Sequence, residues 1–297
     1  MARVLALIGF VLLCWGSVVS AQTIITDEEI LASDRPEAWA MNYAMAGSFM
    51  TAFGETPTLA PGQWSVAAEV GHIPRLSEAQ QRVGFGGDKA EDLNKSPVFG
   101  RGRISLGLPG GWIAEVGYTP PVSIDGTKPH DLFALALGRR LLERDTWTWS
   151  ARAFGQHGSA SGDITCPEQV VGPFDAQTNP FGCVAPSHDR IALNYYGLDS
   201  TIGWGGSWRW HATGGLVRTE PAVQIDALVF TARDRSHLVA RGVLPYLALG
   251  VSHKLAPRWT VAAEVLHVPL DVRRDANGGV DNDAFTSLRL RLGWSPE

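Results

Sequence analysis

The sequence predicts an all-β fold, an antiparallel transmembrane β-barrel of about 10 strands with a short N-terminal helix before it. Three observations lead to this prediction. Apolar residues alternate with small or polar residues in segments about ten residues long. The connections between these segments alternate between short and long. A tryptophan begins every segment that follows a short connection or the N-terminal region.

The first 21 residues have the features of a secretory signal peptide. They carry one positive charge at Arg3, an apolar run, and the small residues Val19, Ser20 and Ala21 at the expected cleavage position. Without Arg3, the 25 Lys and Arg residues become 24 against 30 Asp and Glu, a net charge of −6. A nucleic-acid-binding protein favours a basic surface, so we expect no nucleic-acid partner.

Residues 22–62 precede the barrel and contain one predicted helix, over about residues 35–53. Asp34 is the expected N-cap, Glu37 follows three residues later, and Gly54 is the expected end. We expect this helix to close the periplasmic mouth or to enter the lumen as a plug. A second interpretation makes its apolar side the flexible wall of an apolar ligand site. The residues of this apolar lid are Trp39, Met41, Met45 and Phe49.

Residues 63–294 form the predicted barrel. The ten predicted strands cover residues 63–73, 98–108, 112–120, 131–141, 147–157, 190–204, 208–219, 238–254, 259–268 and 284–294. The short connections are rich in Gly, Pro or charge, as tight turns are. The long connections cover residues 75–97, 121–130, 158–189, 220–237 and 270–283. A soluble β-sandwich has no reason to sort its connections by length, whereas outer-membrane barrels have short periplasmic turns and long outer loops.

Tryptophan at the strand starts predicts an aromatic girdle. The girdle residues are Trp64, Trp112, Trp147, Trp208 and Trp259, joined by Trp294 at the end of the last strand. If the strands that begin with tryptophan run outward from the periplasm, these indoles lie at one height, at the inner membrane interface. Amphipathic indole rings favour that interface. Aromatic residues can also begin strands in a soluble core. A tryptophan begins all five of these strands, however, which favours the girdle.

Side chains alternate between the two faces of a strand, so an outward Trp64 places Glu69 in the lumen. This count also places Arg209 and His211 inside. The residues expected to form an ionic network in the lumen are Glu69, Arg101, Arg103, Glu115, Arg152, Asp199, Glu264, Arg289 and Arg291. Buried charges without partners are costly, so we expect an ionic network. The last strand pairs with the first, and we expect Arg289 and Arg291 to reach Glu69 and Glu264. A barrel of about this size is filled by side chains.

Cys166 and Cys183 are the two cysteines outside the predicted signal peptide. A secreted chain meets an oxidising compartment, which predicts one disulfide between them, in the longest outer loop. Two free thiols are the alternative.

The region from residue 63 to residue 294 resembles a Gram-negative outer-membrane β-barrel protein. The resemblance rests on the strand alternation, the connection lengths, the girdle, and a final strand, FTSLRLRLGW, that ends in an aromatic residue. A tail, residues 295–297, follows this strand. The resemblance implies a location in the cell outer membrane, contact with membrane lipid and lipopolysaccharide, and the barrel assembly machinery as a partner. It identifies no characterised subfamily.

Two functions stay open on the sequence: a structural or surface-interaction protein, and a narrow channel or binding protein for a small apolar or amphiphilic solute. A third hypothesis, an outer-membrane hydrolase, depends on His157 and Ser159, whose spacing resembles that of lipid A deacylases. Ala160 stands where that motif has Asn. No group of residues combines a nucleophile, a base and an oxyanion site, so we expect no enzyme, no cofactor and no metal.

Overall fold

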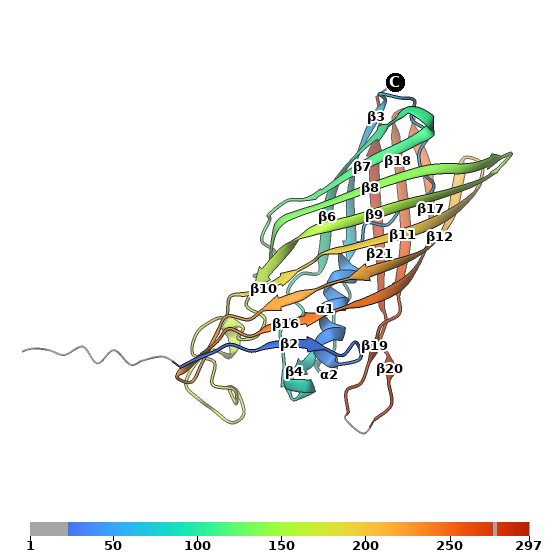
Figure 1. Cartoon of the computed structure of the whole chain (residues 1–297). Coiled ribbons are helices and arrows are strands. Elements are labelled where there is room, and N and C mark those ends of the chain that lie inside the picture. Colours follow the sequence, from blue (N-terminus) through green and yellow to red (C-terminus); the bar gives the residue numbers. More distant parts are fainter. Residues whose placement is uncertain (1–22, 276–277, 297) are drawn as a thin grey trace, which may run out of the picture.

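A computed structural model describes residues 23–275 and 278–296, so the predicted signal peptide lies outside the described residues. Ten long strands form a closed antiparallel barrel (Figure 1), which confirms the predicted fold class. The barrel strands are β3 (Trp64–His72), β6 (Val98–Gly107), β7 (Trp112–Thr119), β8 (Lys128–Arg144), β9 (Trp147–Gly162), β11 (Tyr195–Gly205), β12 (Trp208–Thr219), β17 (Gly242–Ala256), β18 (Trp259–Val268) and β21 (Phe285–Trp294). Each strand pairs with the next, and the pairing of β21 with β3 closes the ring.

Side chains alternate between the outside and the inside of the barrel, and those on the outside are apolar. Along β21, Leu288, Leu290 and Leu292 are about half exposed, whereas Ser287 and Arg289, at the alternate positions, are buried. A closed barrel leaves no unpaired strand edge, which is the condition for strands to cross a lipid bilayer. The apolar exterior and the closed ring place the chain in the cell outer membrane.

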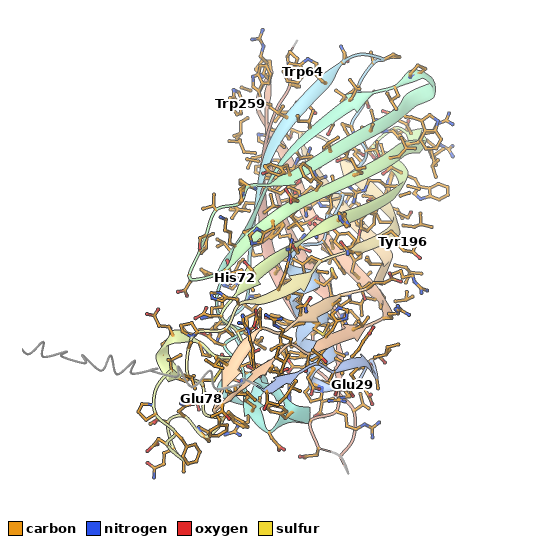
Figure 2. All side chains as sticks on the ribbon, turned by 60° about the vertical axis from the view of Figure 1, so that its left-hand side comes forward. Glu29, Trp64, His72, Glu78, Tyr196 and Trp259 are labelled. Carbon is orange, nitrogen blue, oxygen red and sulfur yellow. A yellow bond between two sulfur atoms is a disulfide. The ribbon has the colours of Figure 1, made fainter. Side chains whose placement is uncertain are left out.

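The two ends of the barrel differ in their connections. Short turns join β6 to β7, β8 to β9, β11 to β12 and β17 to β18, and they lie at the end that holds the C-terminus. Trp64 and Trp259 lie at this end, and Glu29 and Glu78 lie at the other (Figure 2). Short turns are periplasmic in barrels of this kind, so we name the two ends the periplasmic end and the outer end.

Two predicted strands are each divided in the structure. The prediction for residues 190–204 covers β10 (Asp189–Ala192) and β11, and the prediction for residues 238–254 covers β16 (His237–Ala240) and β17. β9 is longer than predicted and pairs with β11 and then with β10. The alternation of apolar residues continues through the break between β10 and β11 and through the break between β16 and β17. The sequence pattern therefore could not show where the barrel strand ends and the outer strand begins.

Short elements extend the outer end. From β10 the sheet continues through β13 (Ala222–Gln224) and β16 to β2 (Glu28–Leu31), which runs parallel to β16. The other short elements are β1 (Thr23–Ile25), β4 (Arg82–Gly84), β5 (Lys89–Ala90), β14 (Ala227–Val229), β15 (Ala232–Asp234), β19 (Asp271–Val272), β20 (Asp281–Asn282), α2 (Glu78–Gln81), η1 (Phe85–Gly87) and η3 (Glu168–Val170). η2 (Pro109–Gly111) forms a periplasmic turn. The described N-terminal strands therefore lie at the outer end.

The predicted helix is shorter than expected. α1 (Pro36–Gly47) begins after Arg35, which makes no side-chain cap, so Asp34 is not the N-cap. The helix ends at Gly47 rather than at Gly54, because distant arginines hold the carbonyl groups that follow, as described below. α1 lies inside the outer half of the barrel (Figure 1), away from the periplasmic mouth. Among the described residues, no helix is long and apolar enough to span a membrane.

Candidate functional site

The lumen contains a segment of the chain itself. Residues 48–62, which we name the lumen segment, follow α1 and run inside the barrel to its periplasmic end. The amide of Met50 donates to the hydroxyl of Tyr195, the residue at the outer end of β11, at 2.8 Å. The amide of Gly62 donates to the Gly107 carbonyl, at the end of β6, at 2.9 Å. The chain thus passes from the outer end to the periplasmic end before β3 begins.

Arginines of the barrel wall donate to the carbonyl groups of this segment and of the last turn of α1. A segment without regular structure has carbonyl groups with no partner of their own, and a buried carbonyl needs one. The pairs are Arg289 with Ala46, Gly47 and Phe49, Arg101 with Ser48, Arg152 with Met50, Arg103 with Thr51, Arg291 with Ala52, and Arg140 with Thr56, at 2.5–3.5 Å. The wall therefore binds the backbone of the lumen segment along most of its length.

Ion pairs connect these arginines to the acidic residues of the wall. Arg103 bonds Glu69 at 2.7 Å and Glu115 at 2.8 Å. Arg152 bonds Asp199 at 2.7 Å and lies 3.5 Å from Glu115. Charged side chains of five strands, β3, β6, β7, β9 and β11, are thus joined in one buried network.

Among the described residues, Arg289 and Arg291 make no direct ion pair with Glu69 or Glu264, although these side chains lie on the predicted strands and face the lumen. The strand register does place Arg289 opposite Glu264 and Arg291 opposite Glu69. However, both guanidinium groups extend to carbonyl groups of the lumen segment, and Glu69 pairs with Arg103. Glu264 accepts a hydrogen bond from the Thr51 hydroxyl and lies 3.6 Å from His211. Strand parity identified the inward residues but could not show what fills the space between them.

The predicted network has five arginines and four carboxylates: Arg101, Arg103, Arg152, Arg289 and Arg291 against Glu69, Glu115, Asp199 and Glu264. Arginine does not lose its proton in proteins, so the wall carries an excess of positive charge. Carbonyl oxygens carry partial negative charge, and the lumen segment supplies them where a fifth carboxylate is missing. The segment is therefore an electrostatic part of the site.

The outer half of the lumen is apolar, and α1 fills it. Eleven of the twelve residues of α1 are buried. The four predicted lid residues, Trp39, Met41, Met45 and Phe49, are each at most 4% exposed. The Phe49 ring packs edge-on against Tyr195, with the ring centroids 5.2 Å apart. These side chains are therefore part of the core rather than of an exposed apolar wall.

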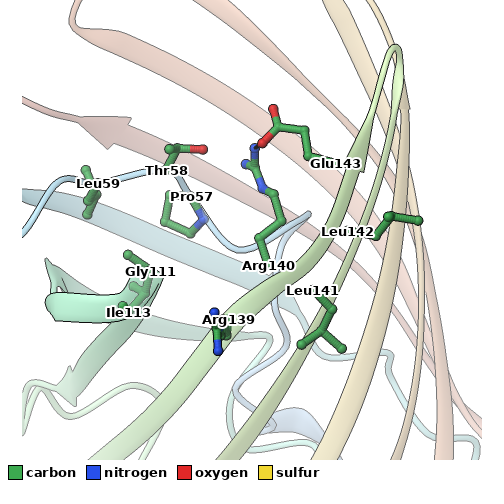
Figure 3. Close-up of a pocket in the computed structure, with 11 residues that line it drawn as sticks. Pro57, Thr58, Leu59, Gly111, Ile113, Arg139, Arg140, Leu141, Leu142 and Glu143 are labelled. Carbon is green, nitrogen blue, oxygen red and sulfur yellow. Dashed lines mark ion pairs between the residues drawn. The ribbon is translucent and has the colours of Figure 1, made fainter.

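The periplasmic mouth contains a small hollow (Figure 3). Its volume is about 270 Å³, and Pro57 and Thr58 of the lumen segment line one side of it. On the opposite side, Arg140 bonds Glu143 at 2.9 Å and also donates to the Thr56 carbonyl at 3.0 Å. Charged side chains therefore fix the lumen segment where it leaves the barrel.

The predicted girdle residues lie on the outside of the barrel. Trp64, Trp112, Trp147, Trp208 and Trp259 are 40–55% exposed, and each is the first residue of its strand. Trp294 is half-buried, and its ring centroid lies 5.5 Å from that of Trp64. All six are next to a short turn or to an end of the barrel sequence, on the periplasmic side.

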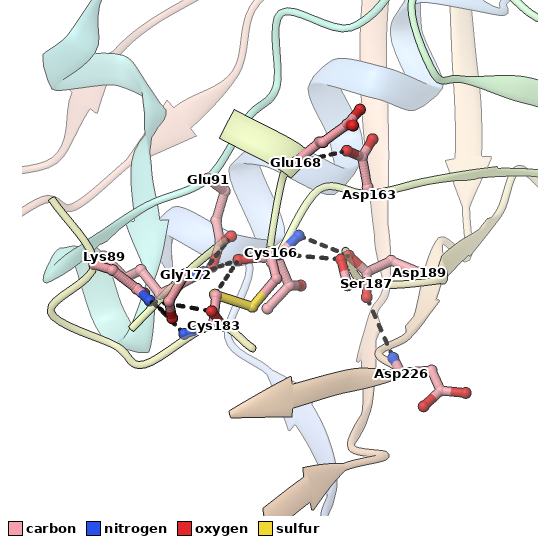
Figure 4. Close-up of a disulfide and its surroundings, with 12 residues drawn as sticks. Lys89, Glu91, Asp163, Cys166, Glu168, Gly172, Cys183, Ser187, Asp189 and Asp226 are labelled. Carbon is pink, nitrogen blue, oxygen red and sulfur yellow. Dashed lines mark hydrogen bonds and ion pairs between the residues drawn. A yellow bond between two sulfur atoms is a disulfide. The ribbon is translucent and has the colours of Figure 1, made fainter. Parts of the chain in front are cut away.

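The predicted disulfide is confirmed. Cys166 and Cys183 are bonded and buried (Figure 4). Next to them, Lys89 of β5 donates to the Thr165 carbonyl and bonds Glu91 at 2.7 Å. Burial raises the pKa of the Glu91 carboxyl to about 8, although the charge of Lys89 acts in the opposite direction. The long connection after β9 is thus fixed to the connection between β3 and β6.

Sequence reasoning missed an aromatic strip at the outer end, which comprises Phe85, Phe174, Phe181 and Phe230. The Phe85 and Phe181 rings stack with centroids 5.7 Å apart, and the centroids of Phe174 and Phe230 are 5.6 Å apart. Phe85, Phe174 and Phe230 are 54–66% exposed. Phe85 and Phe230 also have a positive φ of 52°, a conformation that is strained for an aromatic residue. The four residues belong to three separate connections, so no local pattern could have identified them.

The residues behind the hydrolase hypothesis do not form a site. His157 is exposed on the outside of β9, whereas Ser159 is buried and accepts a hydrogen bond from Arg190 at 2.8 Å. Within the part of the chain that the structure describes, no group of three or more His, Cys, Asp or Glu side chains is placed to hold a metal ion.

No protein-family model and no curated protein sequence matches this chain. Similar solved structures include Neisserial surface protein A, at 7% identity, 78% of this chain, 97% of that chain and a TM-score of 0.32. The translocator domain of the autotransporter NalP from Neisseria meningitidis is 12% identical over 80% of this chain and 89% of that chain, with a TM-score of 0.35. The Pseudomonas putida toluene transporter TodX is 13% identical over 92% of this chain and 78% of that chain, with a TM-score of 0.33. At these values the comparisons do not assign a role, and the assignment of the fold rests on the barrel itself.

Proposed function

We propose that this protein is a sealed outer-membrane barrel with a structural or surface-interaction role. One observation carries the proposal: the lumen is occupied by the chain's own residues 36–62, whose backbone the wall arginines bind. Side chains alone fill a barrel of about eight strands, and in this ten-stranded barrel α1 and the lumen segment take up the additional space. A path for solutes would need α1 and the lumen segment to move.

The outer end supplies the interaction surface in this proposal. It combines the strands β1 and β2, a connection that the disulfide holds, and the exposed aromatic strip. Exposed apolar patches on a soluble face mark binding surfaces, and strained residues gather at functional sites. We propose that the strip contacts a partner outside the cell. We further propose that the protein has no catalytic role, and that the barrel assembly machinery recognises β21.

Conductance measurements test the sealed lumen. The full chain, refolded into planar lipid bilayers, should give no stable current steps. A matched variant that lacks residues 36–56 should conduct, provided that its heat-dependent mobility on a gel shows a folded barrel. Stable current through the full chain would overturn the proposal and favour the alternative function, a narrow channel for a small apolar or amphiphilic solute.

Binding to the outer surface can be tested separately. Replacing Phe85, Phe174 and Phe230 together by Ser should abolish adhesion of cells that display the protein, while the amount of folded barrel stays constant. Replacing the exposed Val122 and Val280, which lie in other outer connections, is the matched control. If adhesion is equal in both variants, the strip is not the interaction surface.

A further inference from the structure

A groove lies in the membrane-facing wall of the barrel. Its volume is about 1030 Å³, and its lining belongs to the four neighbouring strands β9, β11, β12 and β17. Most of the lining side chains point away from the lumen, and Leu198, Leu216 and Leu247 among them are 59–67% exposed. The groove is therefore on the lipid side of the wall and independent of the sealed lumen.

Small residues at one level of the wall create the hollow. Gly214 of β12 faces outward, with Ser200 opposite on β11 and Leu247 opposite on β17. One level further out, Leu216 lies between Leu198 and Pro245. The larger side chains thus form walls around a floor that has no side chain at Gly214.

The rim of the groove carries the guanidinium group of Arg218, which is half exposed and lies 3.5 Å from the Glu220 carboxylate. Arg218 lies on the same outward face of β12, two residues beyond Leu216, and it lines the groove. Tyr196 lies opposite Arg218 on β11, is 60% exposed, and projects from the barrel wall (Figure 2). Arg218 is ten residues from the girdle residue Trp208. At about 3.3 Å per residue and a tilt of about 40°, this separation is about 25 Å, the height of the apolar band.

That height places the guanidinium group at the level of the outer-leaflet headgroups, directly above an apolar groove. A planar guanidinium group binds phosphate through two parallel hydrogen bonds, and a tyrosine at the interface has one apolar and one polar side. The groove below buries an alkyl chain against leucine side chains, which is favourable in proportion to the apolar area that is covered. The two features together select an amphiphile that carries phosphate and acyl chains.

We propose that this groove is a binding site for a phosphorylated, acylated glycolipid of the outer leaflet, of the lipid A class. One acyl chain lies over Gly214 between Leu198 and Leu216, and the phosphate is bound by Arg218. The site faces lipid along the full wall, so the ligand enters from the membrane without any movement of the barrel.

Native mass spectrometry of the full chain in detergent micelles, titrated with hexa-acylated lipid A, tests this site. Gly214→Leu should fill the floor, since a Cβ there meets its nearest neighbour, Leu247, at an ordinary 3.7 Å. Arg218→Gln should remove the charge. Each variant should weaken binding by about tenfold, the equivalent of one charge-assisted hydrogen bond or a lost chain contact. Phosphate-free lipid A should bind the unaltered protein as weakly as lipid A binds Arg218→Gln.

Two control variants have matching chemistry elsewhere on the outside. Gly102→Leu adds a side chain at an outward glycine of β6, where a Cβ is 3.8 Å from the nearest atom, and Arg139→Gln removes an exposed arginine near the periplasmic end. Both should bind lipid A as the unaltered protein does. The proposal is overturned if Gly214→Leu and Arg218→Gln keep full affinity, if the controls lose as much, or if phosphatidylglycerol binds as tightly as lipid A.

Discussion

α1 and the lumen segment fill two halves of the same lumen in different ways. α1 fills the outer half with apolar side chains, and its backbone groups bond one another within the helix. The lumen segment fills the periplasmic half, and its carbonyl groups take hydrogen bonds from arginines of the wall. The wall changes to match: along β21 the inward residues run from Phe285 at the outer end to Arg289 and Arg291.

The comparison shows that the wall is complementary to the backbone conformation of the plug. A helix leaves few backbone groups without partners, so an apolar wall is sufficient around it. An irregular segment leaves most of its carbonyl groups without partners, so the wall around it must supply donors. β18 shows the same change from apolar to polar side chains: Leu266 and Val268 belong to the core cluster around α1, whereas Glu264 accepts a hydrogen bond from the Thr51 hydroxyl of the lumen segment.

The largest expected effect, which is all-or-none, tests the orientation of the barrel: the half that contains α1 should face the outside of the cell, and the half that contains the lumen segment should face the periplasm. A protease site inserted between Thr26 and Asp27, next to the outer strands β1 and β2, should be cut by protease added to intact cells. The same site inserted between Gly206 and Ser207, in a periplasmic turn, should stay intact. The reverse pattern would mean that α1 enters from the periplasm, and the barrel would have to be oriented the other way.

Breaking the periplasmic half should have the next largest effect. Arg103→Leu removes the ion-pair partner of Glu69, the nearer of the two arginines that pair with Glu115, and the donor to the buried Thr51 carbonyl. Leaving buried carboxylates without a partner should lower the free energy of unfolding by about 3–5 kcal/mol. The control, Arg139→Leu, changes an exposed arginine that contacts only the Trp112 ring among the interactions described, and should cost at most about 1 kcal/mol. Equal denaturant midpoints of the two folded variants in lipid vesicles would contradict an ionic role for this half.

Breaking the outer half should have a somewhat smaller effect of another kind. Met45→Ala leaves a cavity where a fully buried side chain packs, at a cost of about 2–4 kcal/mol. Because Met45 is uncharged and packs among apolar side chains, this loss should not depend on salt concentration, whereas the loss for Arg103→Leu, which removes a charge, should depend on it more. Denaturation in low and high salt checks this. A salt-dependent loss for Met45→Ala would show that the two halves are coupled.

The smallest effect is a pH dependence at the outer end. The pKa of Glu91 is raised from 4.5 to about 8, so over this range the folded connection keeps a proton that the unfolded connection has released. Its stability should therefore fall as the pH rises from 4.5 to about 8 and then level off. Proteolysis of the connection should be faster at about pH 9 than at about pH 5, relative to Glu91→Gln, which should show no such change. Equal pH profiles for the two proteins would exclude Glu91 as the cause.

The alternation of side chains along the strands predicted which wall residues face the lumen and which face the lipid. It therefore predicted which charged residues face the lumen, such as Glu69 and Arg152. It could not predict their partners, because the lumen segment has no periodicity and its carbonyl groups are invisible in a pattern of side chains. The end of α1 was missed for the same reason: Arg289, from the far end of the chain, binds the carbonyl groups of Ala46 and Gly47. Contacts between residues more than two hundred positions apart leave no local signal.

The threaded lumen also constrains the order in which the protein can be assembled. The strand pairing that closes the ring joins β3 to β21, the first and the last barrel strand in chain order. Residues 23–47 lie toward the outer end of the barrel, whereas β3 begins at its periplasmic end. Drawing a folded helix through a finished ring of this width would break every arginine contact on the way. The simplest order is the reverse one, in which the earliest part of the chain lies in position first and the strands wind around it, so that the plug acts as a template for its own barrel.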